Sequence, residues 1–220
     1  YLTFEELKEK VEKNQTDKDD KLIILYTSDK EAQHTYIESA KDKGYEVLLL
    51  DSPIVPHLIQ KLEAEHENKV SFVRVDSDHI DNLIKKDEEK ISKLDEKQKE
   101  TLKTEFEEVV SKEKYTVQLE DMNSDAMPIM ITQPEFMRRM KEMQQTGGGG
   151  GMFGMGNMPE MYNLVVNTNH PLIENILNTK TKKKKQRLIN QSLDLALLSQ
   201  NLLKGEAMTK FIKRSFDMVK

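Results

Sequence analysis

The chain has 220 residues, enough for one large domain or two small ones. Charged residues make up 33% of it and hydrophobic residues 36%, and the net charge of −5 argues against a basic nucleic-acid binder. The absence of cysteine excludes a disulfide scaffold, a thiolate zinc site and a cysteine nucleophile, and no apolar run approaches the ~20 residues of a membrane span.

Residues 1–80 predict a small α/β fold. Buried strands are expected at residues 22–26, 45–50 and 70–75, with helices at 28–42 and 54–64 between them. Thr3 and Glu6 have the spacing of a capping box at the start of a first helix, and Ser28 and Glu31 repeat that spacing later. Strands that alternate with helices indicate a small parallel sheet.

Residues 85–113 are dense in charge and leave one narrow apolar stripe, which includes Leu102 and Phe106. The pattern predicts a long exposed helix or helix pair that connects two parts of the chain. The first predicted domain therefore covers residues 1–113.

Residues 114–220 predict an α+β domain with terminal helices. Strands are expected at 115–119, 128–131 and 162–166, and helices at 134–145, from Pro171 onward, at 184–203 and at 206–219. Thr168 or Asn169 is expected to cap the helix that begins at Pro171. Gly205 is expected to stop the helix at 184–203.

The motifs of common enzymes are absent from the sequence. It contains no phosphate-binding loop, no G-x-S-x-G elbow and no H-E-x-x-H zinc motif, and no two histidines share a helix face. Asp76, Asp78 and His79 could hold a cation, but a helix cap is the more frequent use of such residues. We therefore expect no catalytic residue, no metal site and no enzyme activity in this chain.

Ten of the twelve methionines fall between Met122 and Met161. Four apolar side chains, those of Phe136, Met137, Met140 and Met143, share one predicted helix with arginines on its polar face. Methionine is flexible and polarizable, so such a helix can bind varied apolar segments. The alternative is ordinary core packing, but the glycine tract that follows the helix contributes no core.

The last two predicted helices are apolar around most of their circumference. A helix of this kind is buried on more than one side, and a two-fold interface between copies would bury it. The predicted dimer contacts are Leu188, Leu195, Leu198, Leu202, Met208, Phe211, Ile212 and Phe216. A monomeric helical core is the alternative, and the basic run at 180–187 is interpreted as a solubilising segment rather than a nucleic-acid site.

Several segments resemble, in order along the chain, the bacterial members of the heat-shock protein 90 chaperone family. YLTFEELKEK, LIILYTSDKEA and YEVLLLDSPIVPHLIQKL resemble the small α/β part of that family's middle domain. PIMITQPEFMRRMKEM resembles the stretch that leads into its client-contacting helix, and MYNLVVNTNHPLIENIL the strand and helix that follow. LDLALLSQNLLKGEAMTKFIKRSFDMV resembles its dimerisation helices.

The resemblance implies a cytoplasmic fragment of an ATP-driven chaperone that forms homodimers and binds non-native clients, with no nucleic-acid or membrane partner. Phe136, Met137, Met140 and Met143 would then contact clients. No cofactor is expected in this chain, because ATP and magnesium would bind the nucleotide-binding domain of the full-length parent. Two alternatives remain: an α/β ligand-binding or enzyme domain with a helical dimerisation appendage, and a nucleic-acid-binding dimer that uses residues 180–187.

Overall fold

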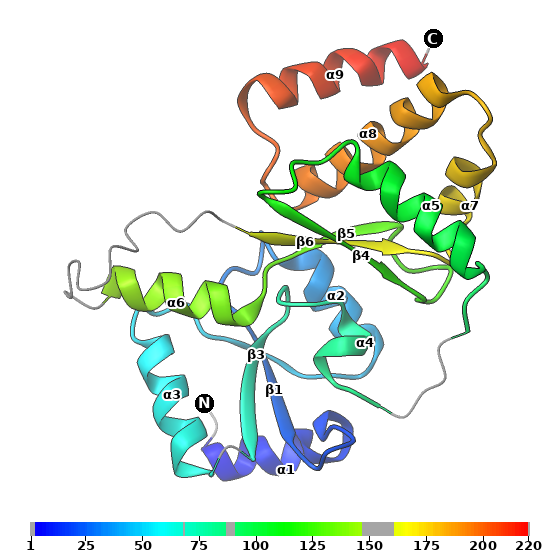
Figure 1. Cartoon of the computed structure of the whole chain (residues 1–220). Helices are drawn as coiled ribbons and strands as arrows, with labels where there is room; N and C mark the ends of the chain where they lie inside the picture. Colours follow the sequence, from blue (N-terminus) through cyan, green and yellow to red (C-terminus); the bar gives the residue numbers. More distant parts are fainter. Residues whose placement is uncertain (1–2, 68, 87–90, 147–160, 220) are drawn as a thin grey trace. The chain divides into compact units, whose positions relative to one another are not determined.

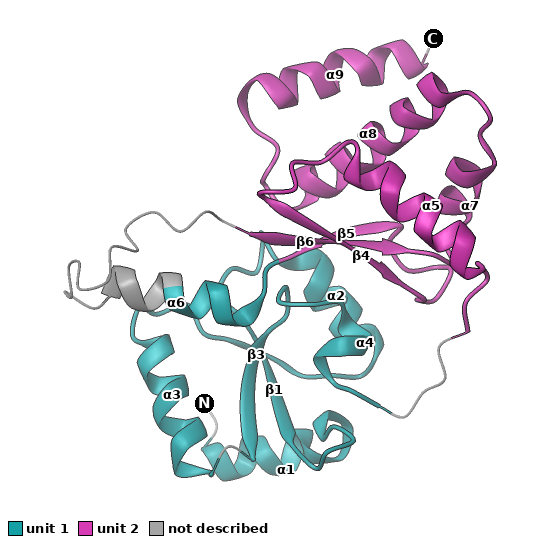
Figure 2. Cartoon of the chain, viewed as in Figure 1, with its two compact units in different colours: residues 1–88, 133–158 teal, residues 89–132, 159–220 magenta. Residues whose placement is uncertain are grey.

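The computed structural model describes residues 3–67, 69–86, 91–146 and 161–219, and the side chains of all of these except 141–146. The chain forms two compact units, one of residues 1–88 and 133–158 and the other of residues 89–132 and 159–220 (Figure 2). The helix expected at 134–145 thus belongs to the first unit, although the sequence placed it in the second module. The domains 1–113 and 114–220 remain predictions, because compactness does not test independent folding.

Unit 1 is built on a parallel sheet in the order β2-β1-β3 (Figure 1). Its strands are β1 (Leu22–Thr27), β2 (Val47–Leu49) and β3 (Val70–Arg74), and its helices are α1 (Phe4–Gln15), α2 (His34–Asp42), α3 (Val55–Glu65), α4 (Ile80–Leu83) and α6 (Glu135–Thr146). Every residue of β1 is buried, as expected for the central strand of a parallel sheet. The predicted small parallel sheet is confirmed.

Helix α1 is fixed at both ends by side-chain hydrogen bonds. The predicted capping box is confirmed: the Thr3 hydroxyl accepts from the Glu6 amide at 3.3 Å, and the Glu6 carboxylate accepts from the Thr3 amide at 2.7 Å. At the other end Gln15 is 1% exposed. It donates to the Ile23 carbonyl at 2.9 Å and accepts from the Glu46 amide at 2.6 Å, which joins α1 to β1 and to the segment before β2.

The second predicted capping box, at Ser28 and Glu31, is wrong. Helix α2 begins only at His34, and its N-cap makes no side-chain capping bond. The Asp29 carboxylate instead accepts from the amides of Glu31 and Ala32 at 2.9 and 3.0 Å. An aspartate that bonds its own backbone in this way favours a turn over a helix.

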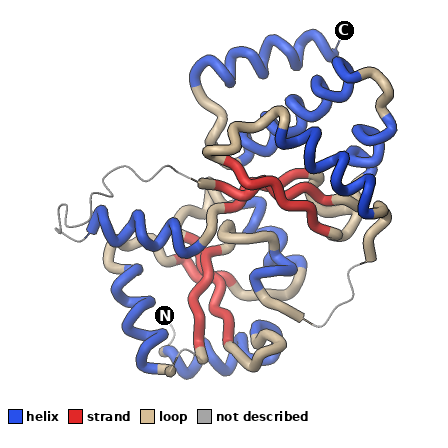
Figure 3. Tube along the Cα trace, in the orientation of Figure 1, coloured by secondary structure: helices blue, strands red, loops and turns tan. Residues whose placement is uncertain are grey.

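Unit 2 contains a mixed sheet in the order β4-β6-β5, in which β4 is parallel and β5 antiparallel to the central β6 (Figure 1). Figure 3 shows the strands in red and the helices in blue. The strands are β4 (Tyr115–Glu120), β5 (Ile129–Thr132) and β6 (Tyr162–Asn167), and the helices are α5 (Glu96–Glu107), α7 (Pro171–Asn178), α8 (Lys182–Ser199) and α9 (Gly205–Val219). The core is formed by side chains from the sheet and all four helices, among them Phe106, Leu164, Ile173, Ile189 and Phe211. The chain is thus a mixed α/β protein.

The charged segment forms a shorter helix than predicted. Helix α5 is capped by Asp95, whose carboxylate accepts from the Gln98 amide at 2.8 Å while the Gln98 side chain accepts from the Asp95 amide. The part of the apolar stripe that lies within α5 is confirmed, since Leu102 and Phe106 are fully buried in the core of unit 2.

Two helix ends in unit 2 differ from the prediction. His170 caps α7, because its Nδ1 accepts from the Leu172 amide at 3.0 Å. Helix α8 ends at Ser199 rather than at residue 203, and Asn201 follows with a φ of 55°. A left-handed residue at this point terminates a helix, so Gly205 begins α9 instead of stopping α8.

Candidate functional site

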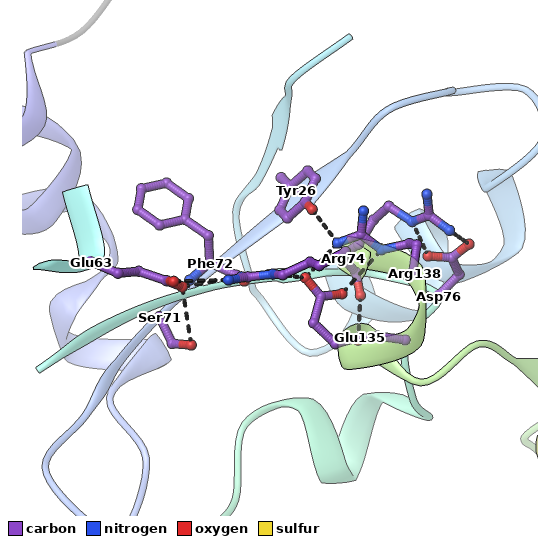
Figure 4. A network of polar contacts seen from close by, with 10 residues as sticks. Tyr26, Glu63, Ser71, Phe72, Arg74, Asp76, Glu135 and Arg138 are labelled. Atoms are coloured by element: carbon purple, nitrogen blue, oxygen red, sulfur yellow. Dashed lines mark hydrogen bonds and ion pairs between the residues drawn. The ribbon is translucent and has the colours of Figure 1, made fainter. Parts of the chain in front are cut away.

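Helix α6, which carries the predicted methionine surface, is attached to unit 1 through its arginines. Arg138 is only 3% exposed. Its guanidinium donates to the Tyr26 hydroxyl and to the Glu135 carboxylate, and its central carbon lies 5.6 Å from the centre of the Tyr26 ring (Figure 4). A buried charge needs such partners, because desolvation without them is costly.

Arg139 forms the second attachment. It donates to the two carboxylate oxygens of Glu63 on α3 at 2.8 and 3.1 Å, to Glu135 at 2.7 Å, and to the Phe72 carbonyl on β3. Burial raises the pKa of Glu63, but hydrogen bonds from Arg139 and from the Phe72 amide outweigh this effect and hold the pKa below its ordinary value. Burial lowers the pKa of Arg139, yet Glu63 and Glu135 hold it above its ordinary value. Both partners of the bidentate pair are therefore charged at neutral pH.

The predicted client-binding residues differ in their exposure. Phe136 is 69% exposed, and Met137 and Met140 are half-buried. Met143 lies in α6, but its side chain is outside the described residues. The sequence predicted an apolar and a basic face for this helix. The structure adds that Arg138, on the basic face, is buried while Phe136 is open to solvent.

Helix α9 is attached to α8 in a similar way. Arg214 donates to the Gln191 side-chain oxygen at 2.7 Å and to the Asp194 carboxylate, and Gln191 donates to the Ser215 hydroxyl at 3.0 Å. Phe211 is 8% exposed and belongs to the core of unit 2. These contacts hold one face of α9 against its own unit.

An apolar stripe runs along α9 and is open to solvent. Ile212, Phe216 and Val219 are 46%, 69% and 86% exposed, and their spacing of four and three residues puts them on one side of the helix. Leu195 on α8 is 51% exposed as well. Exposed apolar residues at helical spacing mark a surface for another helix.

The other predicted dimer residues lie nearer to the interior. Leu188, Leu198, Leu202 and Met208 are half-buried and pack against the core of unit 2. The exposed apolar surface of α8 and α9 is therefore narrower than the predicted set. It also includes Val219, which continues the helical spacing of its neighbours but is not among the predicted contacts.

The basic run at 180–187 has carboxylate partners within unit 2. Lys185 lies 2.6 Å from the Glu105 carboxylate, and Lys182 lies 3.1 Å from that of Glu108. Lysines in the first turn of α8 are repelled by the positive end of the helix dipole. The carboxylates of Glu105, in α5, and Glu108, directly after α5, offset that repulsion. The pairs favour a structural use of the run.

Within the described ranges, no group of three or more histidine, cysteine, aspartate or glutamate side chains is placed to hold a metal ion. No helix in that same part of the chain is both long and apolar enough to cross a membrane. The exposed faces of α6 and α9 can bind apolar surface, and they are the features that suggest a function.

Each unit has a helix with exposed apolar side chains: Phe136 on α6 in unit 1, and Ile212, Phe216 and Val219 on α9 in unit 2. The sequence profile of the family described as Hsp90 protein matches residues 3–220, so the chain belongs to the Hsp90 family, as its resemblances predicted. It is similar to the chaperone protein HtpG of Bacteroides fragilis strain YCH46 and to that of Bacteroides thetaiotaomicron. Identity is 34% over 286 residues in both cases, covering 100% of this chain and 42% of each relative.

The HtpG of Porphyromonas gingivalis strain ATCC 33277 is 35% identical over 280 residues, which cover 97% of this chain and 40% of the relative. The chain thus spans about two fifths of the length of these relatives. The alignment with the Bacteroides proteins extends over 286 residues, more than the 220 of this chain, so the relatives contain residues without a counterpart here.

Proposed function

We propose that this chain is the dimerisation and client-binding part of an HtpG-like chaperone. The observation that carries the proposal is the open apolar stripe of Ile212, Phe216 and Val219 on a helix that already packs against its own unit through Phe211. A second copy related by a two-fold axis would cover the stripe with the same stripe, since cyclic dimers use one self-complementary patch. Leu195 would extend the interface onto α8.

Sedimentation of the purified chain tests the dimer. We expect a species of twice the chain mass at tens of micromolar. A monomer at that concentration would contradict the proposal, because an exposed stripe would then have another use.

For client binding we propose the surface of Phe136, Met137, Met140 and Met143. Its support is the exposure of Phe136 beside two half-buried methionines, whose side chains can repack around varied apolar segments. Replacing Met137 and Met140 by serine should weaken binding of a destabilised test protein by about tenfold or more, because burying each side chain contributes on the order of 1.5–3 kcal/mol. Unchanged affinity, or a loss of stability alone, would show that the two methionines are core.

We also propose that the chain itself binds no nucleotide and hydrolyses none, and that ATP and magnesium act elsewhere in a full-length protein. The described residues offer no group of three or more histidine, cysteine, aspartate or glutamate side chains that could hold a metal ion. The proposed compartment is the cytoplasm, and the proposed partners are a second copy and non-native proteins, without nucleic acid or membrane. ATP hydrolysis by the chain above background in a coupled assay would contradict the proposal that it hydrolyses no nucleotide.

A groove in unit 1 supports a second candidate, a ligand-binding α/β domain. The groove has a volume of about 460 Å³, and its lining includes Phe4, Leu7, Leu49, Leu58 and Phe72. Ligand sites of this size usually contain a few convergent polar groups, whereas threonine is the only polar residue in this lining. A small-molecule screen against the chain would detect such a ligand, and the chaperone assignment remains the better supported one.

A further inference from the structure

The attachment of α6 is unusual for an amphipathic helix. Such a helix normally buries its apolar stripe and leaves its charges in water. In α6, Arg138 is 3% exposed whereas Phe136, two residues before it, is 69% exposed. The orientation of the helix must therefore be set by the partners of its arginines.

Those partners are fixed in unit 1 by bonds of their own. The Glu63 carboxylate accepts from the Phe72 amide at 2.8 Å and from the Ser71 hydroxyl at 3.4 Å, so β3 holds it in place beside Arg139. Tyr26 lies in the central strand and is 3% exposed (Figure 4). Both acceptors are therefore pre-oriented, and little side-chain entropy is lost when the guanidinium groups bind.

We propose that Arg138 and Arg139 are positioning residues that dock the client-binding helix on the α/β unit, with Tyr26 and Glu63 as their receptor. The docking turns Phe136 outward and ties the orientation of the apolar surface to unit 1. The consequence for clients rests on the function proposed above, whereas the docking itself does not.

The test is amide hydrogen exchange of α6 in the Glu63→Gln variant. This change keeps the shape of the side chain and removes the charge that Arg139 binds in bidentate fashion. We expect α6 amides to exchange about tenfold faster or more, because hydrogen bonds to charged groups are the strong ones, while the amides of β1 stay protected. Lys61→Gln is the matched control, since Lys61 lies on the same helix as Glu63 and its ion pair with Glu65 is solvent-exposed.

Two further variants separate docking from a general loss of stability. Arg139→Gln should accelerate α6 exchange at least as much as Glu63→Gln, because it also removes the bonds to Glu135 and to the Phe72 carbonyl. The double variant should be no worse than Arg139→Gln alone, because the bond to Glu63 is already lost in that variant. Arg139→Lys keeps the positive charge but loses the two-pronged guanidinium group that binds both oxygens of Glu63. The α6 amides of this variant should therefore exchange more slowly than those of Arg139→Gln. Unchanged α6 exchange in both single variants, or equal acceleration in α6 and β1, would overturn the proposal.

Client affinity provides an independent readout. If α6 exchange accelerates and the affinity for a destabilised test protein falls, docking and client binding are both supported. If exchange accelerates and affinity stays constant, docking holds and the proposed client surface is wrong. The two proposals can therefore fail separately.

Discussion

Replacing Phe216 by alanine is the sharpest test of the α9 surface. A phenylalanine side chain buries about 150–250 Å², so the 69% that is exposed here corresponds to roughly 140 Å². Covering that area contributes about 3.5 kcal/mol per copy at ~25 cal/mol per Å². Because a two-fold interface contains the residue twice, the full loss would be about 7 kcal/mol per dimer. If only half of that free energy is realised, the dimer is weakened by about 3 kcal/mol and its Kd rises by more than about 100-fold.

The measurement is a dilution series followed by sedimentation, with thermal unfolding monitored by circular dichroism alongside. Because Phe216 contacts its own unit through only a minor part of its surface, the fold of the monomer should be almost unaffected. Lys213→Ala, on the same exposed helix, is the control and should leave Kd within about twofold. A Kd for Phe216→Ala equal to that of the wild type would show that α9 does not form the dimer contact.

Three other changes test the fold. Gln15→Ala leaves the buried Ile23 carbonyl and the partly buried Glu46 amide without their partner, so urea denaturation should show a free energy of unfolding lower by about 1–3 kcal/mol. Gly205→Ala places a β-carbon at a φ of 58° and should cost about 1 kcal/mol, measured as a lower Tm. Burial raises the pKa of Asp121, but bonds from Thr168 and Lys99 hold it below its ordinary value. Asp121→Asn should therefore destabilise the protein at neutral pH. The difference from wild type should persist above about pH 4, the ordinary value for an aspartate, and shrink as the pH falls through the lower folded pKa. A difference that does not change with pH would contradict this assignment.

The elements that the sequence predicted well are those set by local patterns. The run at 22–26 is apolar throughout because its strand is central, and the pair Thr3 and Glu6 forms its capping box within a single turn. The errors fall where several local bonds compete. Asp29 formed a turn where a helix start was expected, and Asn201 ended α8 before the glycine that was expected to do so.

For the candidate surfaces too, the sequence predicted local features but not long-range contacts. The spacing of Ile212 and Phe216 predicted an apolar face on the last helix, and both side chains are exposed. The burial of the α6 arginines could not be predicted, because Arg139 binds Glu63 at a separation of 76 residues and Arg138 binds Tyr26 at a separation of 112. Local sequence patterns cannot predict a contact between residues so far apart in the chain, because only the folded structure brings them together.

Unit 1 is discontinuous in sequence, and this has a consequence for its synthesis and for its dissection. Its sheet is complete by Arg74, yet the helix that covers Tyr26 and Glu63 follows two strands of the other unit. During translation these two acceptors stay without their arginines until residues 133–146 have emerged, and a contact of such long range forms slowly. For the same reason no single cut separates the units: a chain truncated before residue 133 keeps the α/β sheet but exposes a polar receptor built for a helix that is missing.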